Sequence, residues 1–167
     1  PLIDSSSVIE IPVGSNRWSV TSDFEKSVPE SDVVLITVPT PVNPDNSPNL
    51  EYVISAARCV LENVDRNRRT AVVLESTVYP GVTRKVLGEL CESLGLNNEI
   101  VTLAYCPERV NPGDFERGIE SVSQIVGCDD QVVGSQLASL FARITNESST
   151  YVGKMEVAEA SKLIENV

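Results

Sequence analysis

We predict a layered α/β fold in which helices flank a mostly parallel sheet. Short, β-branched apolar runs alternate along the chain with segments whose apolar residues recur at helical spacing. This alternation is typical of crossover units that join parallel strands. In addition, three successive apolar runs each end in a loop rich in Pro, Thr, Ser and Glu. Because ligands of such sheets bind beyond the carboxyl ends of the strands, we expect a site there.

The first clear strand covers residues 32–38, whose sequence is DVVLITV. A continuous β-branched run of this kind is typical of a strand buried on both faces. A short edge strand is predicted before it at residues 8–11, followed by a turn of helix. After it comes a proline-rich loop, in which Ser47 and Pro48 are predicted to begin a helix as its N-cap and first residue.

The remaining elements follow from the same alternation. Apolar residues recur every three or four positions in the helical segments, and Gly95 is predicted to end the second of them as a C-cap. The predicted helices cover residues 49–64, 81–95, 130–144 and 155–167. The predicted strands after the first cover residues 70–76, 100–106, 123–128 and 149–153.

Composition excludes several classes of function. The chain has 167 residues, a net charge of -11 and no His. Such an acidic chain repels nucleic acid and anionic membrane surfaces, so neither is expected as a partner. No apolar run is long enough to cross a bilayer, and we expect a cytoplasmic protein.

Four cysteines occur, and none has the spacing of a metal ligand set. Without His, a zinc site is not expected either, so no metal site is predicted. We interpret these residues as small core side chains in a reducing compartment: Cys59, Cys91, Cys106 and Cys128.

Four motifs in order carry a resemblance to a known family. Three are the loops "VPTPV", "ESTVYPGVT" and "CPERVNPGD", and the fourth is the terminal "EASKLIENV". Together they resemble the UDP-glucose/GDP-mannose dehydrogenase family, in its "PER" branch acting on UDP-N-acetyl-hexosamines, over roughly residues 19–167. The resemblance implies a partial, Rossmann-like NAD-binding domain over residues 1–154. Residues 155–167 would begin the helix leading to a central, dimerisation domain.

The resemblance also implies a reaction. The family oxidises the C6 alcohol of a UDP-sugar to a carboxylate in two hydride steps to NAD, through a covalent intermediate on a cysteine that water then releases. By this likeness Thr77 holds the hydrolytic water, Glu108 is the general acid/base, and Lys162 and Asn166 stabilise the oxyanion. Lys162 and Asn166 are four residues apart, so they share a helix face, as two donors of an oxyanion site require.

Binding residues follow from the same likeness. The cofactor NAD would contact Val38, Pro39, Thr40, Ser76 and Thr77. The UDP-sugar would contact Glu108, Arg109 and Val110.

Each assignment has an ordinary structural alternative. Glu108 could be solvated, Lys162 could be a surface lysine, and Arg109 could serve only in a salt bridge. Thr77 could cap the turn before the helix at Gly81. Glu159, three residues before Lys162, is interpreted as structural.

The sequence departs from the family in three places. No Gly-rich turn precedes residue 31, none of the cysteines lies in a Gly-rich segment, and Pro112 stands where some branches carry a second acid. We therefore expect the chain alone to be inactive, with weak or absent NAD binding. The sheet would also have an open edge beside residues 32–38, covered by residues 8–11, by a second copy in a homodimer, or by further polypeptide.

Two other interpretations stay open. The chain could be a stand-alone, non-catalytic module that dimerises or binds a sugar nucleotide. More remotely, it could belong to a different nicotinamide dehydrogenase that shares only the general fold.

Overall fold

A five-stranded sheet forms the centre of the structure, a computed structural model that describes residues 20–109, 122–145 and 147–165. The strands lie in chain order: β1 (Val33–Ile36), β2 (Thr70–Leu74), β3 (Val101–Tyr105), β4 (Gln124–Cys128) and β5 (Ser149–Gly153). Neighbouring strands are parallel except for β3 and β4, which are antiparallel. The predicted mostly parallel sheet is confirmed, but β4 does not follow β3 through a parallel crossover.

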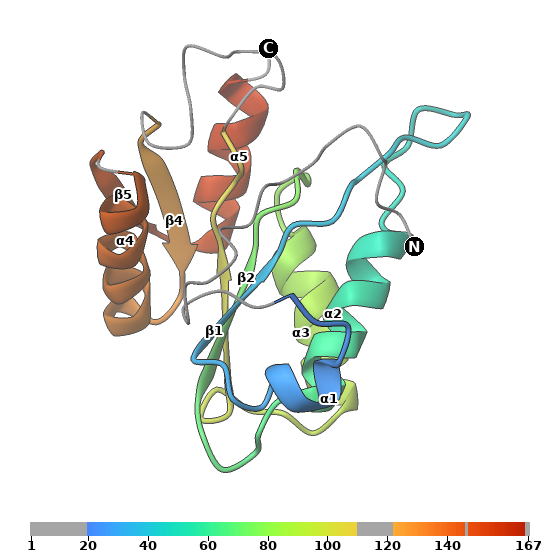
Figure 1. The fold of residues 1–167 in the computed structure, drawn as a ribbon. Coiled ribbons are helices and arrows are strands. Elements are labelled where there is room, and N and C mark those ends of the chain that lie inside the picture. Colours follow the sequence, from blue (N-terminus) through green and yellow to red (C-terminus); the bar gives the residue numbers. More distant parts are fainter. Residues whose placement is uncertain (1–19, 110–121, 146, 166–167) are drawn as a thin grey trace.

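Helices cover both faces of the sheet, as predicted (Figure 1). One face carries α2 (Glu51–Asn63), the π-helical turn η1 (Thr83–Leu87), α3 (Gly88–Ser93) and α5 (Met155–Glu165). The other carries α4 (Gln131–Thr145). The short α1 (Phe24–Ser27) precedes β1. The edge strand predicted at residues 8–11 lies outside the described residues.

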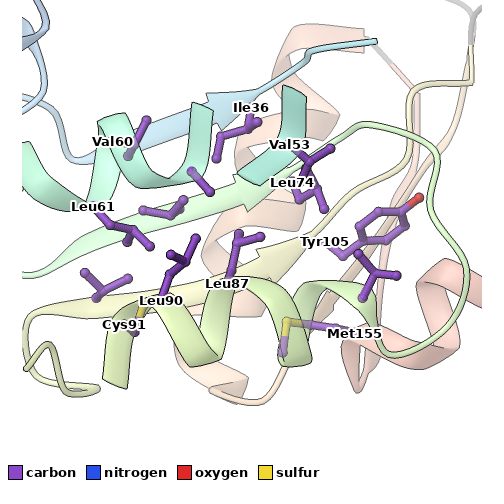
Figure 2. Packing of buried hydrophobic residues seen from close by; sticks show 14 of the residues in the cluster. Ile36, Val53, Val60, Leu61, Leu74, Leu87, Leu90, Cys91, Tyr105 and Met155 are labelled. Atoms are coloured by element: carbon purple, nitrogen blue, oxygen red, sulfur yellow. The ribbon is translucent and has the colours of Figure 1, made fainter. Parts of the chain in front are cut away.

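The larger core lies between the sheet and the helices α2, α3 and α5. Val53 and Leu61 of α2 lie in the same cluster as Leu87 of η1 and Leu90 of α3, and all four side chains are buried (Figure 2). At one end of this layer, the ring of Tyr105 and the side chain of Met155 extend the same cluster (Figure 2). The first turn of α5 is therefore part of the core of the sheet.

A smaller core lies beneath α4. Leu137 and Phe141 of that helix pack on the alternate strand residues Val73, Ala104 and Val126. The alternation places odd-numbered residues of β2 on this face, and even-numbered residues such as Leu74 on the other. β2 therefore contributes side chains to both cores.

The prediction that β1 is buried on both faces is wrong. Within β1 only Ile36 is fully buried, and Leu35 is 42% exposed. The reason is that β1 pairs only with β2 among the described strands, so it is an edge strand, and its α4-side face is partly open. The central β2, by contrast, is buried at every residue.

The start of α2 also differs from the prediction. Ser47 and Pro48 lie in the preceding loop, where the Ser47 carbonyl accepts a hydrogen bond from the Asn43 amide at 2.8 Å. The helix begins three residues after Pro48, and the Asn49 side chain accepts from the Glu51 amide. The predicted end of the next helix is confirmed, because Gly95 has φ +66 and the chain closes there with hydrogen bonds to the last turn.

Candidate functional site

The loops after β1 and β2 are joined by side-chain hydrogen bonds at the carboxyl ends of the strands. The Thr40 hydroxyl donates to the Thr77 carbonyl at 2.9 Å. The Ser76 hydroxyl donates to the Val38 carbonyl at 2.6 Å. Four of the five residues expected to contact NAD are thus brought together, and the fifth, Pro39, lies exposed between Val38 and Thr40.

The loop after β3 joins the same edge. The Cys106 amide donates to the Leu74 carbonyl at 3.0 Å, and the Glu108 amide donates to the Glu75 carbonyl at 3.2 Å. The Glu75 amide in turn donates to the Ile36 carbonyl of β1 at 2.9 Å. These bonds place Thr40, Thr77 and Glu108 along one rim, which we call the carboxyl rim.

A buried carboxylate ties α5 to the loop after β2. Glu159 is 0% exposed and accepts from the Gly81 amide at 2.6 Å and from the Thr83 amide at 2.9 Å. The Thr83 hydroxyl adds a third bond at 2.6 Å. Glu159, rather than Thr77, therefore satisfies the amides at the start of η1. The structural interpretation of Glu159 is consistent with these contacts.

Arg109 and Lys162 converge on Glu165 at the end of α5. The Arg109 guanidinium lies 2.6 Å from a Glu165 carboxylate oxygen and also donates to the Ser123 carbonyl at 2.9 Å. The Lys162 ammonium lies 3.9 Å from the other oxygen of Glu165. Arg109, the nearer cation, lowers the pKa of Glu165, and Lys162 adds to the effect.

These contacts bear on the structural alternatives given above for Lys162 and Arg109. Lys162 is only 8% exposed, so it is no ordinary surface lysine. Arg109 does make the salt bridge that its structural alternative predicted. Val110 and Asn166, the other predicted site residues nearby, lie outside the described residues.

Glu75 is a rim residue to which sequence reasoning assigned no role. Its carboxyl group is half-buried, and burial together with the nearby charge of Glu108 raises its pKa to about 7. A sequence signal for it existed. Glu75 continues the alternation of Ala71 and Val73, which both face α4.

Three of the four cysteines are buried, as predicted, whereas Cys59 is only half-buried. Cys106, beside Glu108 in the sequence, is 1% exposed, and its thiol lies 3.7 Å from the Gln124 side-chain oxygen. Burial raises the pKa of this thiol, which disfavours the nucleophilic thiolate. All four cysteines are free. Groups of three or more potential metal ligands do not occur in the part of the chain that the structure describes.

A cavity of about 590 Å³ lies away from the carboxyl rim. Its walls include the ion pairs of Arg69 with Asp130 and of Arg84 with Asp129, at the opposite end of β3. Both arginines are already paired, and none of the predicted site residues lines this cavity. We therefore place the candidate site at the rim.

Comparison with known proteins identifies relatives. Residues 4–145 match the sequence model of the UDP-glucose/GDP-mannose dehydrogenase family, NAD binding domain. The similarity thus starts nearer the beginning of the chain than the motifs indicated. Over 148 residues the chain is 34% identical to UDP-N-acetyl-D-glucosamine 6-dehydrogenase of Salmonella typhi, covering 87% of this chain and 34% of the relative. It is also 34% identical to UDP-N-acetyl-D-mannosamine dehydrogenase of Escherichia coli, covering 82% and 34%.

Solved structures agree in fold. A UDP-glucose dehydrogenase from Pyrobaculum islandicum superposes with a TM-score of 0.75 at 29% identity, covering 87% of this chain and 34% of that one. UDP-D-ManNAc dehydrogenase from Pyrococcus horikoshii gives 0.73 at 30% identity, covering 85% and 33%. The chain therefore spans about a third of the length of these relatives. None of the helices in the described ranges could span a membrane.

Proposed function

Because this chain belongs to the UDP-glucose/GDP-mannose dehydrogenase family and matches its NAD binding domain, we propose that it forms the cofactor-side part of an NAD-dependent nucleotide-sugar 6-dehydrogenase. The proposed reaction oxidises the C6 alcohol of a UDP-sugar to a carboxylate in two hydride steps. The relatives most similar in sequence are named for UDP-N-acetyl-hexosamines, which makes these the first substrates to test.

One observation carries the proposal: the three predicted loops share the carboxyl rim, joined by the Thr40–Thr77 and Glu108–Glu75 hydrogen bonds. The loops that follow neighbouring parallel strands lie at one edge of the sheet, and this is the edge where ligands of such sheets bind. The salt bridge between Arg109 and Glu165 brings the end of α5 to the same loop as Glu108.

NAD, when bound, supplies the hydride acceptor, and the rim residues fit part of it. The hydroxyl groups of Thr40 and Ser76 donate within the rim, so their oxygens keep lone pairs for ribose or amide donors. The helix start at Gly81 does not fit a pyrophosphate, since Glu159 already occupies its amides. We therefore propose that Val38, Pro39, Thr40, Ser76 and Thr77 hold the uncharged part of NAD, and that the chain alone binds NAD weakly.

The catalytic roles follow from chemistry at the rim. We assign Glu108 as the general acid/base and Thr77 as a residue that orients water. Lys162, held near the rim by α5, supplies an ammonium group for a developing oxyanion, together with Asn166. Binding of the sugar by Arg109 and Val110 requires Arg109 to exchange Glu165 for the substrate, because the guanidinium now bonds Glu165 and Ser123.

The Arg109–Glu165 salt bridge also favours a second candidate, a non-catalytic module that dimerises or binds a sugar nucleotide without turnover. In that case the salt bridge is the permanent role of Arg109. Domain limits of 1–154 and 155–167, a homodimer and a cytoplasmic location belong to the proposal as well. The four free cysteines are compatible with that compartment.

Calorimetric titration of the chain with NAD and with UDP-N-acetyl-hexosamines tests the proposal. We expect weak NAD binding that falls on Thr40→Ala, and sugar-nucleotide binding that is lost on Glu108→Ala. The exposed Glu99→Gln variant is the control and leaves both unchanged. If neither ligand binds, the proposed site is wrong. If a sugar nucleotide binds and NAD does not, the result favours the non-catalytic module.

A further inference from the structure

Glu75 has a fixed position beside Glu108. Its backbone amide bonds to Ile36 of β1, and its carbonyl accepts the amide of Glu108. The residue is thus anchored between the ends of three neighbouring strands. Because strand positions alternate between faces, its side chain lies on the α4 side of the sheet, with Ala71 and Val73.

Glu75 and Glu108 share a cavity of about 100 Å³. Glu75 and Glu108 line it together with Gln124 of β4 and with Thr145 at the end of α4. Its other walls are apolar side chains, those of Leu35, Pro107, Phe141 and Ile144. Because four of its lining residues are polar, a cavity of this size has room for water that bridges the two glutamates.

The charges around Glu75 are unbalanced. Among the described residues, neither a cation nor a hydrogen-bond donor contacts its carboxyl group. The walls from β1, β4 and α4 carry no charged group, and the loop after β3 supplies Cys106, Glu108 and Arg109. The guanidinium of Arg109 is bonded to Glu165 and Ser123, so it does not neutralise Glu75.

We propose that Glu75 is a positioning residue for Glu108: the protonated carboxyl group of Glu75 donates a hydrogen bond to the Glu108 carboxylate, directly or through water in the shared cavity. The pair then carries one negative charge, located on Glu108. This inference rests on the proposed function for the catalytic role of Glu108, but the pairing itself does not. Two adjacent carboxyl groups in an apolar setting share a proton because both cannot ionise cheaply.

The consequence for the proposed reaction concerns Glu108 alone. A general base has to be ionised before it can take a proton from water. Neutral Glu75 leaves Glu108 ionised and fixes its orientation through the donated hydrogen bond. When the pH rises and Glu75 loses its proton to solvent, the second charge repels that of Glu108, and the orienting bond is lost.

NMR titration of the side-chain carboxyl carbons in the ligand-free chain tests the pairing. In the wild type we expect the Glu75 carbon to titrate near pH 7, and the signal of the neighbouring Glu108 carbon to move as Glu75 ionises. In Glu75→Gln, whose amide imitates the protonated acid, this movement of the Glu108 signal disappears. In Glu108→Gln, the midpoint of Glu75 falls, but stays above its ordinary value because burial is the larger cause.

Glu99→Gln, which removes an exposed carboxylate, leaves both curves unchanged and is the matched control. A Glu75 carbon that titrates at the ordinary value of 4.5, or a Glu108 signal that does not respond when Glu75 ionises, overturns the inference. Neither outcome depends on NAD or on a sugar nucleotide. Loss of the pairing with ligand binding intact therefore contradicts only the inference, and intact pairing without ligand binding contradicts only the proposed function.

Discussion

The Glu159 carboxylate accepts hydrogen bonds from both the amide and the hydroxyl group of Thr83, at 2.9 and 2.6 Å. Together with its bond to Gly81, this makes Glu159 a buried polar link between α5 and the helix that follows β2. The link crosses a layer that is otherwise apolar, since Met155 and Ala158 of the same helix are buried in the larger core. It thereby positions the helix that carries Lys162.

Replacing Glu159 should destabilise the chain strongly. Glu159→Ala leaves two buried donors of Thr83 and the part-buried amide of Gly81 without an acceptor, and we expect a loss of about 3–5 kcal/mol in the free energy of unfolding. Glu159→Gln keeps one acceptor but turns an amide NH₂ toward the donors, so it should fall between the wild type and Glu159→Ala. Urea unfolding measures both, with Glu99→Gln as an exposed control. Equal stability of Glu159→Ala and the wild type would contradict the link.

The close packing of α5 on β4 predicts that alanine substitutions at two glycines have opposite effects on stability. A Cβ on Gly127 would lie 2.7 Å from the Met155 Cα and 2.8 Å from the Lys154 carbonyl oxygen. Both are backbone atoms, so Gly127→Ala should cost about 2 kcal/mol or more and displace α5. A Cβ on Gly88 would meet nothing within 4 Å, and its helical backbone suits alanine.

Gly88→Ala should therefore stabilise the chain by about 0.5–1 kcal/mol. Thermal and urea unfolding of the two variants measure the contrast. If both substitutions change stability in the same direction, the close approach of α5 to Gly127 is contradicted.

Sequence reasoning succeeded where a local pattern decides the structure. The strand positions, the C-cap at Gly95 and the meeting of the loops at Thr40, Thr77 and Glu108 all follow from periodicity or from parallel topology. These features depend on residues close in sequence, or on a rule that holds for every parallel sheet.

Sequence reasoning failed where residues distant in the sequence determine the local structure. The β-branched run in β1 predicts a buried strand, yet Leu35 is exposed because no described strand lies on its outer side. The salt bridge of Arg109 with Glu165 joins residues 56 positions apart, and no local sequence pattern predicts it. The antiparallel direction of β4 was likewise not readable from its composition.

Burial predicts slow thiol chemistry in the folded chain. Burial raises the pKa of Cys91 to about 11 and also raises that of Cys128. We expect these thiols and Cys106 to react with a chromogenic disulfide reagent at least about 100-fold more slowly in the folded chain than in urea. Cys59, which is only half-buried, serves as the internal reference. Rapid labelling of Cys106 in the folded chain would reopen the question of a nucleophile beside Glu108.

The salt bridge between Arg109 and Glu165 predicts a pH-dependent contribution to stability. Arg109 holds the pKa of Glu165 below its ordinary value of 4.5. A carboxyl group with a lowered folded-state pKa stabilises the fold above its ordinary pKa, and the contribution is lost as the pH falls through the folded-state value. Since the pair is partly exposed, Glu165→Gln should cost no more than about 1 kcal/mol at neutral pH.

The same variant should match the wild type in acid. We expect urea unfolding to show the difference at about pH 7, and the difference to disappear once the pH falls below the lowered folded-state pKa of Glu165, where the group is protonated in both states. High salt should also reduce the difference at neutral pH, because the pair lies near solvent. Glu99→Gln, without a cation beside it among the described residues, should show no difference at either pH. A destabilisation by Glu165→Gln that persists in acid would mean that Glu165 acts through packing rather than through its charge.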